Sequence, residues 1–113
     1  MTQDSGAKSE RIAQLNDAFR QTLRGGQVFL TAGVSDLPAE EVASLLGKVR
    51  KFDAFSEDND PWGEHDFGSF DHHGNKIYWK IDYYDKRLEW GSEDPADPDQ
   101  TIRVLTVMLA EEY

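Results

Sequence analysis

Apolar residues in the first part of the chain recur at spacings of three and four, the period of an amphipathic helix. This pattern predicts a helix that begins near Ser9 and ends at the Gly25-Gly26 pair, because glycine readily adopts the left-handed conformation that ends helices. Its apolar face would consist of Ile12, Leu15, Phe19 and Leu23. Residues 1–8 precede the pattern and are expected to form a flexible lead-in.

A short strand and a second helix are predicted next. Residues 27–34 contain a run of β-formers around Val28, which favours a strand. Asp36 is then a suitable N-cap for a helix over residues 36–52, with Pro38 tolerated in its first turn. The acidic residues that follow Pro38 and the basic residues near Lys51 both complement the helix dipole.

The third part of the chain predicts an antiparallel meander. Residues 76–84 alternate strictly between apolar and polar positions, which is typical of a strand with one buried face. Shorter strands are predicted over residues 67–70 and 88–90. The buried positions would be Ile77, Trp79, Ile81, Tyr83, Leu88 and Trp90, and Tyr78, Asp82 and Tyr84 would point the other way.

Residues 102–110 are apolar on most sides and are predicted to form a buried helix. Asp97 would cap it, with Pro98 at its first position. The order is therefore helix, strand, helix, three strands and helix, which indicates the α+β class with helices packed on a mainly antiparallel sheet. Residues 9–113 are enough for one such domain and too few for two independent cores.

The charge of the chain is concentrated in one segment. Of 22 acidic and 12 basic residues, 14 acids and four bases fall within residues 52–99, so the whole net charge of −10 resides there. Ten of the thirteen aromatic residues share this segment, whereas disordered acidic tails contain few aromatics. A folded acidic surface is therefore expected, and it either keeps the protein soluble or binds a basic partner.

The sequence lacks cysteine, a signal peptide and a membrane span, and these absences limit the expected chemistry and location. The chain has no cysteine, which excludes disulfides, thiolate metal sites and thiol nucleophiles. Its polar N-terminus lacks the apolar run of a signal peptide, and no apolar stretch approaches the ~20 residues of a membrane span. A cytoplasmic location without membrane contact is therefore expected, and no motif calls for a cofactor.

An acidic face favours a basic protein surface as partner, in particular that of a nucleic-acid-binding complex, and disfavours direct contact with nucleic acid. Duplex DNA carries one charge per ~1.7 Å, so ten charges correspond to about 17 Å of duplex, and a homodimer would double this length. The leading hypothesis is a non-enzymatic inhibitor that mimics nucleic acid. Its candidate contact residues are Asp58, Asp60, Glu64, Asp66, Asp82, Asp85, Glu93, Asp94 and Asp97, with Tyr78 and Tyr84 as apolar anchors.

One cluster suggests catalysis instead. Glu64, His65 and Asp66 are consecutive, and His72 and His73 follow at a distance that a hairpin would bring close. A histidine beside carboxylates can act as a general base, and the three histidines could hold a divalent metal. A metal-assisted hydrolase is therefore an alternative function, although no established metal-binding spacing is present. The opposing interpretation makes His72 and His73 exposed turn residues and gives His65 a structural role.

Several strings resemble a family of small bacterial proteins without assigned activity, the domain-of-unknown-function family numbered 3768. They are residues 59–68 (NDPWGEHDFG), 79–85 (WKIDYYD), 91–95 (GSEDP) and the C-terminal run from Arg103 to Tyr113. The resemblance extends from about Gln27 to Tyr113 and implies a proteobacterial protein carried by a plasmid, phage or genome. A mobile-element origin would favour a role against host defence, as in anti-CRISPR or anti-restriction proteins. A small regulatory partner of a neighbouring gene product is a further alternative.

Overall fold

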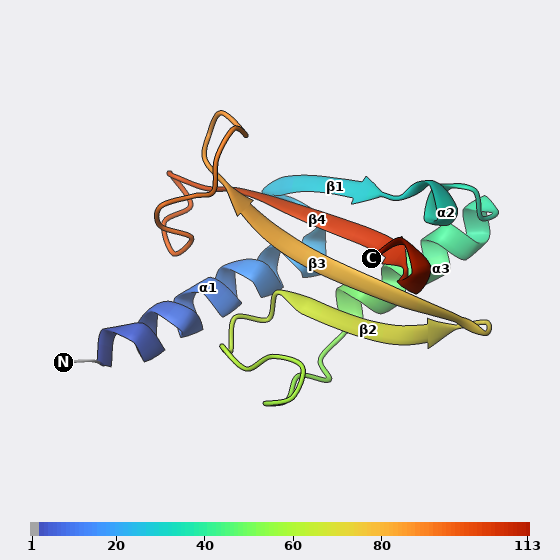
Figure 1. Cartoon of the computed structure of the whole chain (residues 1–113), viewed down its shortest axis with the longest axis horizontal. Coiled ribbons are helices and arrows are strands. Elements are labelled where there is room, and N and C mark those ends of the chain that lie inside the picture. Colours follow the sequence, from blue (N-terminus) through green and yellow to red (C-terminus); the bar gives the residue numbers. More distant parts are fainter. Residues whose placement is uncertain (1–2) are drawn as a thin grey trace.

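The computed structural model describes residues 3–113 as helices packed on one face of a four-stranded sheet (Figure 1). The strand order is β1-β4-β3-β2, with β1 parallel to β4 and the other neighbours antiparallel. This arrangement confirms the predicted α+β class. The elements are α1 (Gln3–Thr22), β1 (Gly26–Leu30), α2 (Ala32–Ser35), α3 (Ala39–Lys51), β2 (Phe67–His72), β3 (Asn75–Tyr84), β4 (Ile102–Leu109) and the 3-10 turn η1 (Ala110–Glu112).

The core lies between the sheet and helices α1 and α3. Trp79, at the middle of β3, is fully buried and meets Phe52 and Phe55 edge to face. Ile77 and Ile81 point to the same side, which confirms the predicted alternation of β3. Buried residues from four other elements complete the core: Phe19, Val34, Leu45, Val49, Leu105 and Val107.

The prediction of a C-terminal helix is wrong, because residues 102–109 form strand β4. β4 is an inner strand with β1 on one side and β3 on the other, and residues on both of its faces are buried. A strand covered on both faces reads as a continuous apolar run, which periodicity does not distinguish from a buried helix. Asp97 caps a turn instead of a helix, since its carboxylate accepts bonds from the Asp99 N–H and the Gln100 amide.

The predicted strand over residues 88–90 is also absent. Asp85 accepts hydrogen bonds from the backbone N–H groups of Arg87 and Glu89, which fixes a turn at this point. Trp90 is consequently 74% exposed, so its assignment to the core is wrong, while that of Trp79 is correct.

The first half of the chain differs from expectation mainly at element ends. Helix α1 begins at Gln3, so residues 3–8 of the expected lead-in are helical, and Met1 and Thr2 lie outside the described residues. Strand β1 ends at Leu30, and the short helix α2 follows it. Asp36 ends α2, whereas α3 begins after Pro38.

Candidate functional site

Two loops at one end of the sheet carry the net charge of the protein. Residues 52–66, between α3 and β2, hold six acids and no lysine or arginine; residues 85–101, between β3 and β4, hold six acids and two bases. Charges within the intervening β2–β3 hairpin balance, with two acids and two bases. We call these two loops together the acidic end.

Strand pairing explains why the two loops are neighbours. The 52–66 loop enters β2 opposite Lys80, and the 85–101 loop leaves β3 at Tyr84 and re-enters the sheet at Ile102, the partner of Tyr84. The two attachment points on β3 are four residues apart, or roughly 13 Å. Figure 1 shows both loops at the same end of the sheet, on the side of the N-terminal half of α1.

A buried polar network ties both loops to α1. The Asn16 amide, which is fully buried, donates to the Glu64 carbonyl and to the Tyr83 hydroxyl, each at 2.9 Å. Tyr83 in turn donates to the Glu64 carboxylate at 2.9 Å. Arg103, 4% exposed, donates to Asn16 at 2.7 Å and to the Pro95 carbonyl of the other loop. Such fully connected polar networks rigidify a structure, so the loops are held in a defined position.

Burial changes the ionisation of this network. It raises the pKa of the Tyr83 phenol, which therefore remains a neutral hydrogen-bond donor at physiological pH. It also lowers the pKa of the Arg103 guanidinium, although the nearby Tyr83 and Glu64 oppose this shift. The geometry supports a structural role for the network, in which the Glu64 carboxylate accepts a hydrogen bond from the Tyr83 hydroxyl.

Several acids at this end are fixed by backbone N–H groups. Asp60 is 8% exposed and accepts bonds from the N–H groups of Glu64 and His65. Hydrogen bonds to Asp85 and Asp97 lower the pKa of both carboxyls, mainly through the Glu89 N–H and the Gln100 side chain. Asp85 and Asp97 therefore stay charged in fixed positions.

The remaining predicted contact acids lie in different surroundings. Asp58 and Glu93 are exposed in the two loops. Asp94 is half-buried, accepts the Ala96 N–H and lies 3.7 Å from the Lys8 ammonium of α1. Asp82 is on β3, outside the loops, and pairs with Lys80 at 3.0 Å.

The predicted apolar anchors lie on the sheet face opposite the helices. Tyr84 borders an open groove of about 640 Å³, lined also by Phe29, Leu88 and Tyr113. Tyr78 is half-buried between the rings of Phe67 and Tyr113, at centroid distances of 5.5 and 5.2 Å. The groove begins at the acidic end, because Tyr84 is the last residue of β3.

Sequence reasoning missed two exposed aromatics. Trp62 is 77% exposed in the 52–66 loop, and Trp90 is 74% exposed in the 85–101 loop. Each acidic loop therefore presents one indole to solvent. The sequence contained no signal that Trp62 is exposed, and the alternation around Leu88 wrongly placed Trp90 in the core.

The consecutive Glu64, His65 and Asp66 do not converge on one position. Glu64 bonds Tyr83, whereas His65 Nδ1 lies 3.0 Å from the Asp17 carboxylate of α1. The His65 ring stacks on Phe55 at 3.9 Å. His65 also borders an open cleft of about 730 Å³ beside Trp62. Glu64 and His65 thus have different partners, from β3 and from α1 respectively.

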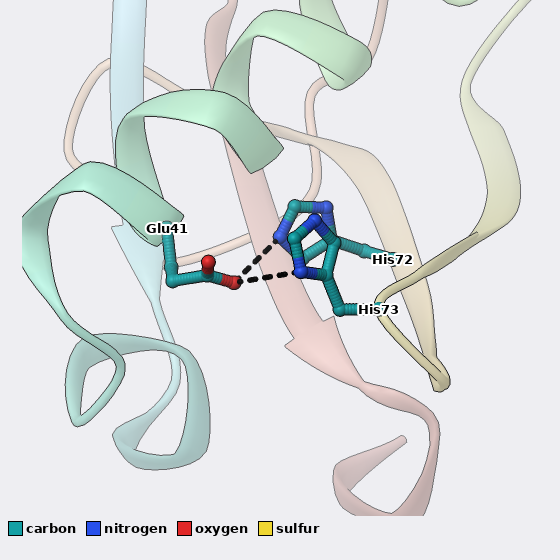
Figure 2. Close-up of side chains that lie close together, drawn as sticks. All are labelled: Glu41, His72 and His73. Carbon is teal, nitrogen blue, oxygen red and sulfur yellow. Dashed lines mark hydrogen bonds and ion pairs between the residues drawn. The ribbon is translucent and has the colours of Figure 1, made fainter.

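His72 and His73 are far from His65. The six-residue strand β2 separates them, a length of roughly 20 Å, so the expectation that the two clusters meet is wrong. At the far end of β2 both histidines instead face Glu41 of α3 (Figure 2). The sequence suggested only a helix-dipole role for Glu41, because only the packing of α3 on the sheet brings it to the hairpin.

Removing the Asp66 carboxylate is expected to stabilise the protein at neutral pH. Burial, and next the neighbouring Glu64 charge, raise the Asp66 pKa, so the folded state binds a proton more tightly than the unfolded state. The ionised group therefore disfavours folding above the raised pKa, and this penalty disappears as the pH falls below the ordinary pKa of aspartate. Asp66→Asn should raise the free energy of unfolding at pH 7 by on the order of 1 kcal/mol.

Urea unfolding of Asp66→Asn at several pH values between 4 and 7 measures this effect. Asp58→Asn is the matched control, since it removes the same charge from an exposed position of the same loop. The expected gain for Asp66→Asn exceeds that of the control at pH 7 and shrinks toward pH 4. Equal gains for both variants at every pH would contradict the assignment.

Comparison with known proteins places the chain in a family without assigned activity. Residues 30–112 match the family described as "Protein of unknown function (DUF3768)", so the chain belongs to this family. No curated protein and no solved structure matches it. In the described part of the chain, no helix combines the length and apolar character needed to cross a membrane.

Proposed function

We propose that this protein is a non-enzymatic binding protein whose acidic end docks on a basic protein surface, in the manner of a nucleic-acid mimic. The observation that carries the proposal is the confinement of the net charge to two neighbouring loops held by one buried network. Fixed charges need no ordering when the partner arrives, which lowers the entropic cost of binding. The expected partner is a nucleic-acid-binding protein, and an anti-CRISPR or anti-restriction role is the biological form this would take.

The dimensions of the molecule agree with this proposal. Ten negative charges correspond to about 17 Å of duplex. The molecule measures 48 × 32 × 23 Å, so a charged surface of that length fits across its end. The acidic end would therefore occupy a short part of a nucleic-acid channel.

The two exposed indoles, Trp62 and Trp90, offer apolar surface that could add binding energy to the electrostatic attraction. Electrostatic complementarity mainly sets association rate and specificity, whereas buried aromatic anchors supply much of the binding energy at protein interfaces. Trp62 and Trp90 stand among the acids of the two loops. We therefore expect them to be the apolar anchors, together with Tyr84 at the groove.

A charge-neutralised variant tests the proposal. The loop variant replaces exposed acids without turn-capping bonds by their amides: Glu57→Gln, Asp58→Asn, Glu93→Gln and Asp99→Asn. A control with the same final charge neutralises four exposed acids elsewhere: Asp36→Asn, Glu40→Gln, Asp71→Asn and Glu111→Gln. Each protein is immobilised, exposed to a bacterial lysate and eluted with a 20-base-pair duplex.

The wild type and the control are expected to retain basic proteins that the duplex displaces, and the loop variant to bind them about tenfold more weakly or worse. Trp62→Ala with Trp90→Ala should weaken binding while leaving its salt dependence unchanged. Equal binding by the loop variant and the control, or retained proteins that the duplex does not displace, would contradict the proposal.

A further inference from the structure

The β2–β3 hairpin turns through His73 and Gly74, and both have positive φ angles, 51° and 85°. His72 pairs with Asn75 across this two-residue loop, so the turn has the left-handed geometry that favours Asn-Gly. Non-glycine residues are uncommon with such a backbone, and histidine is among those found there most often. The turn places two adjacent imidazoles above the first turn of α3.

Both imidazoles point at one carboxylate oxygen (Figure 2). His72 Nε2 lies 3.1 Å from Glu41 Oε1, and His73 Nδ1 lies 3.7 Å from the same oxygen. The rings stack at 4.3 Å. Glu41 and His72 come from elements 31 residues apart in sequence, so the cluster forms only on folding.

If the cluster served only to hold the hairpin against α3, the contact between His72 and Glu41 would be enough. The pair of buried His72, 1% exposed, with Glu41 already anchors the hairpin to α3. His73 is 64% exposed at its side chain and adds little packing, yet its ring is turned toward the same oxygen despite the left-handed backbone. His72 Nδ1 is buried and has no hydrogen-bond partner among the described residues. A buried imidazole with an unpaired nitrogen is an expensive hydrogen-bond anchor.

We propose that Glu41, His72 and His73 bind a zinc ion. Tetrahedral zinc with bonds of about 2.0–2.1 Å places neighbouring ligand atoms roughly 3.3 Å apart. The two nitrogen–oxygen distances of 3.1 and 3.7 Å lie on either side of that spacing. Imidazole ligands favour zinc over magnesium or calcium, which prefer oxygen.

The site would leave one coordination position to solvent. Three protein ligands with an open fourth position are characteristic of zinc sites that bind water or an exogenous ligand. The opening faces outward, because His73 is exposed and Glu41 half-exposed. The absence of a hydrogen-bond partner for His72 Nδ1 is expected to make such a site about 10- to 100-fold weaker than one whose imidazole has that partner.

Isothermal titration calorimetry, in which zinc is added to the metal-free protein, tests the assignment. The variant that carries the test is His73→Asn, because asparagine suits the left-handed turn and keeps the hairpin while removing one ligand. His65→Asn is the matched control: His65 also has a positive φ, 55°, and lies outside the cluster. Glu41→Gln removes the carboxylate without changing side-chain size.

Wild type and His65→Asn are expected to bind one zinc ion per chain. His73→Asn and Glu41→Gln should lose at least tenfold in affinity. Cobalt bound to the wild type should give the intense visible absorption of tetrahedral coordination, and this absorption should be absent in His73→Asn. Zinc binding unchanged in His73→Asn, or no binding by the wild type at 100 μM zinc, would overturn the proposal.

Discussion

Replacing Arg20 with methionine is expected to lower the free energy of unfolding by about 3–5 kcal/mol, the usual cost of breaking a buried charged network from one side. Arg20 is 1% exposed and donates to the carbonyls of Val49 and Phe52, each at 2.9 Å. These groups end helix α3, whose last carbonyls have no partner within the helix. Methionine fills similar space but leaves them unsatisfied and buried.

The Arg20 guanidinium also holds aromatic side chains in place. Its central carbon lies 5.0 Å from the Trp79 ring and 5.5 Å from the Phe55 ring. The guanidinium nitrogen Nη2 donates to the Asp17 carboxylate at 2.9 Å, and the same carboxylate contacts His65 Nδ1. Lysine should not substitute, because one ammonium cannot reproduce the planar set of donors.

Guanidinium chloride unfolding of Arg20→Met provides the measurement, and Arg50→Met is the control. Arg50 also donates to a helix-end carbonyl, that of Gln21 at 2.9 Å, but it is exposed. Water can replace its hydrogen bond, so the control should lose less than about 1 kcal/mol. Equal losses in the two variants would show that burial does not set the value of the Arg20 contacts.

Trp79→Ala is expected to cost about 3–5 kcal/mol as well, because truncating a large buried aromatic removes its hydrophobic burial and leaves a cavity. The indole is fully buried, and Gly68 on the paired strand lies against it so closely that an added Cβ would come within 2.5 Å of its Nε1. Because this residue of β2 is a glycine, β2 has no side chain at this position that could fill the cavity.

The other two tryptophans are the controls for this experiment. Trp62→Ala and Trp90→Ala remove side chains that are 77% and 74% exposed, so each should change the free energy of unfolding by less than about 0.5 kcal/mol. Thermal unfolding with circular dichroism detection measures all three. A large loss in Trp90→Ala would restore the core role that its sequence pattern suggested.

Local sequence patterns were sufficient to predict the core residues of an element that has one buried face and one exposed face. The alternation of β3 identified Ile77, Trp79 and Ile81 as core. β4 failed this criterion because both of its faces are covered. The β-branched residues of that segment, Ile102, Val104, Thr106 and Val107, were the local signal that favoured a strand.

The candidate sites were less accessible to sequence reasoning than the fold. The acidic segment was evident from composition, but its division into two loops depends on the β3–β4 pairing. Neither Asn16 nor Glu41 stood out, because each acquires its role from partners 31 to 87 residues away. The motif around His65 was identified, and packing against Asp17 determined what its side chain contacts.

The acidic character of the segment, its aromatic content, the buried face of β3 and the family strings were determined by the sequence itself, because they depend on residue identity and short-range periodicity. Tertiary structure decided that residues 102–109 form an inner strand, that Trp62 and Trp90 face solvent, and that His72 and His73 meet Glu41 instead of His65. These outcomes depend on which distant strands and helices pack together. That choice is made by the burial of the whole core, which no local window of the chain contains.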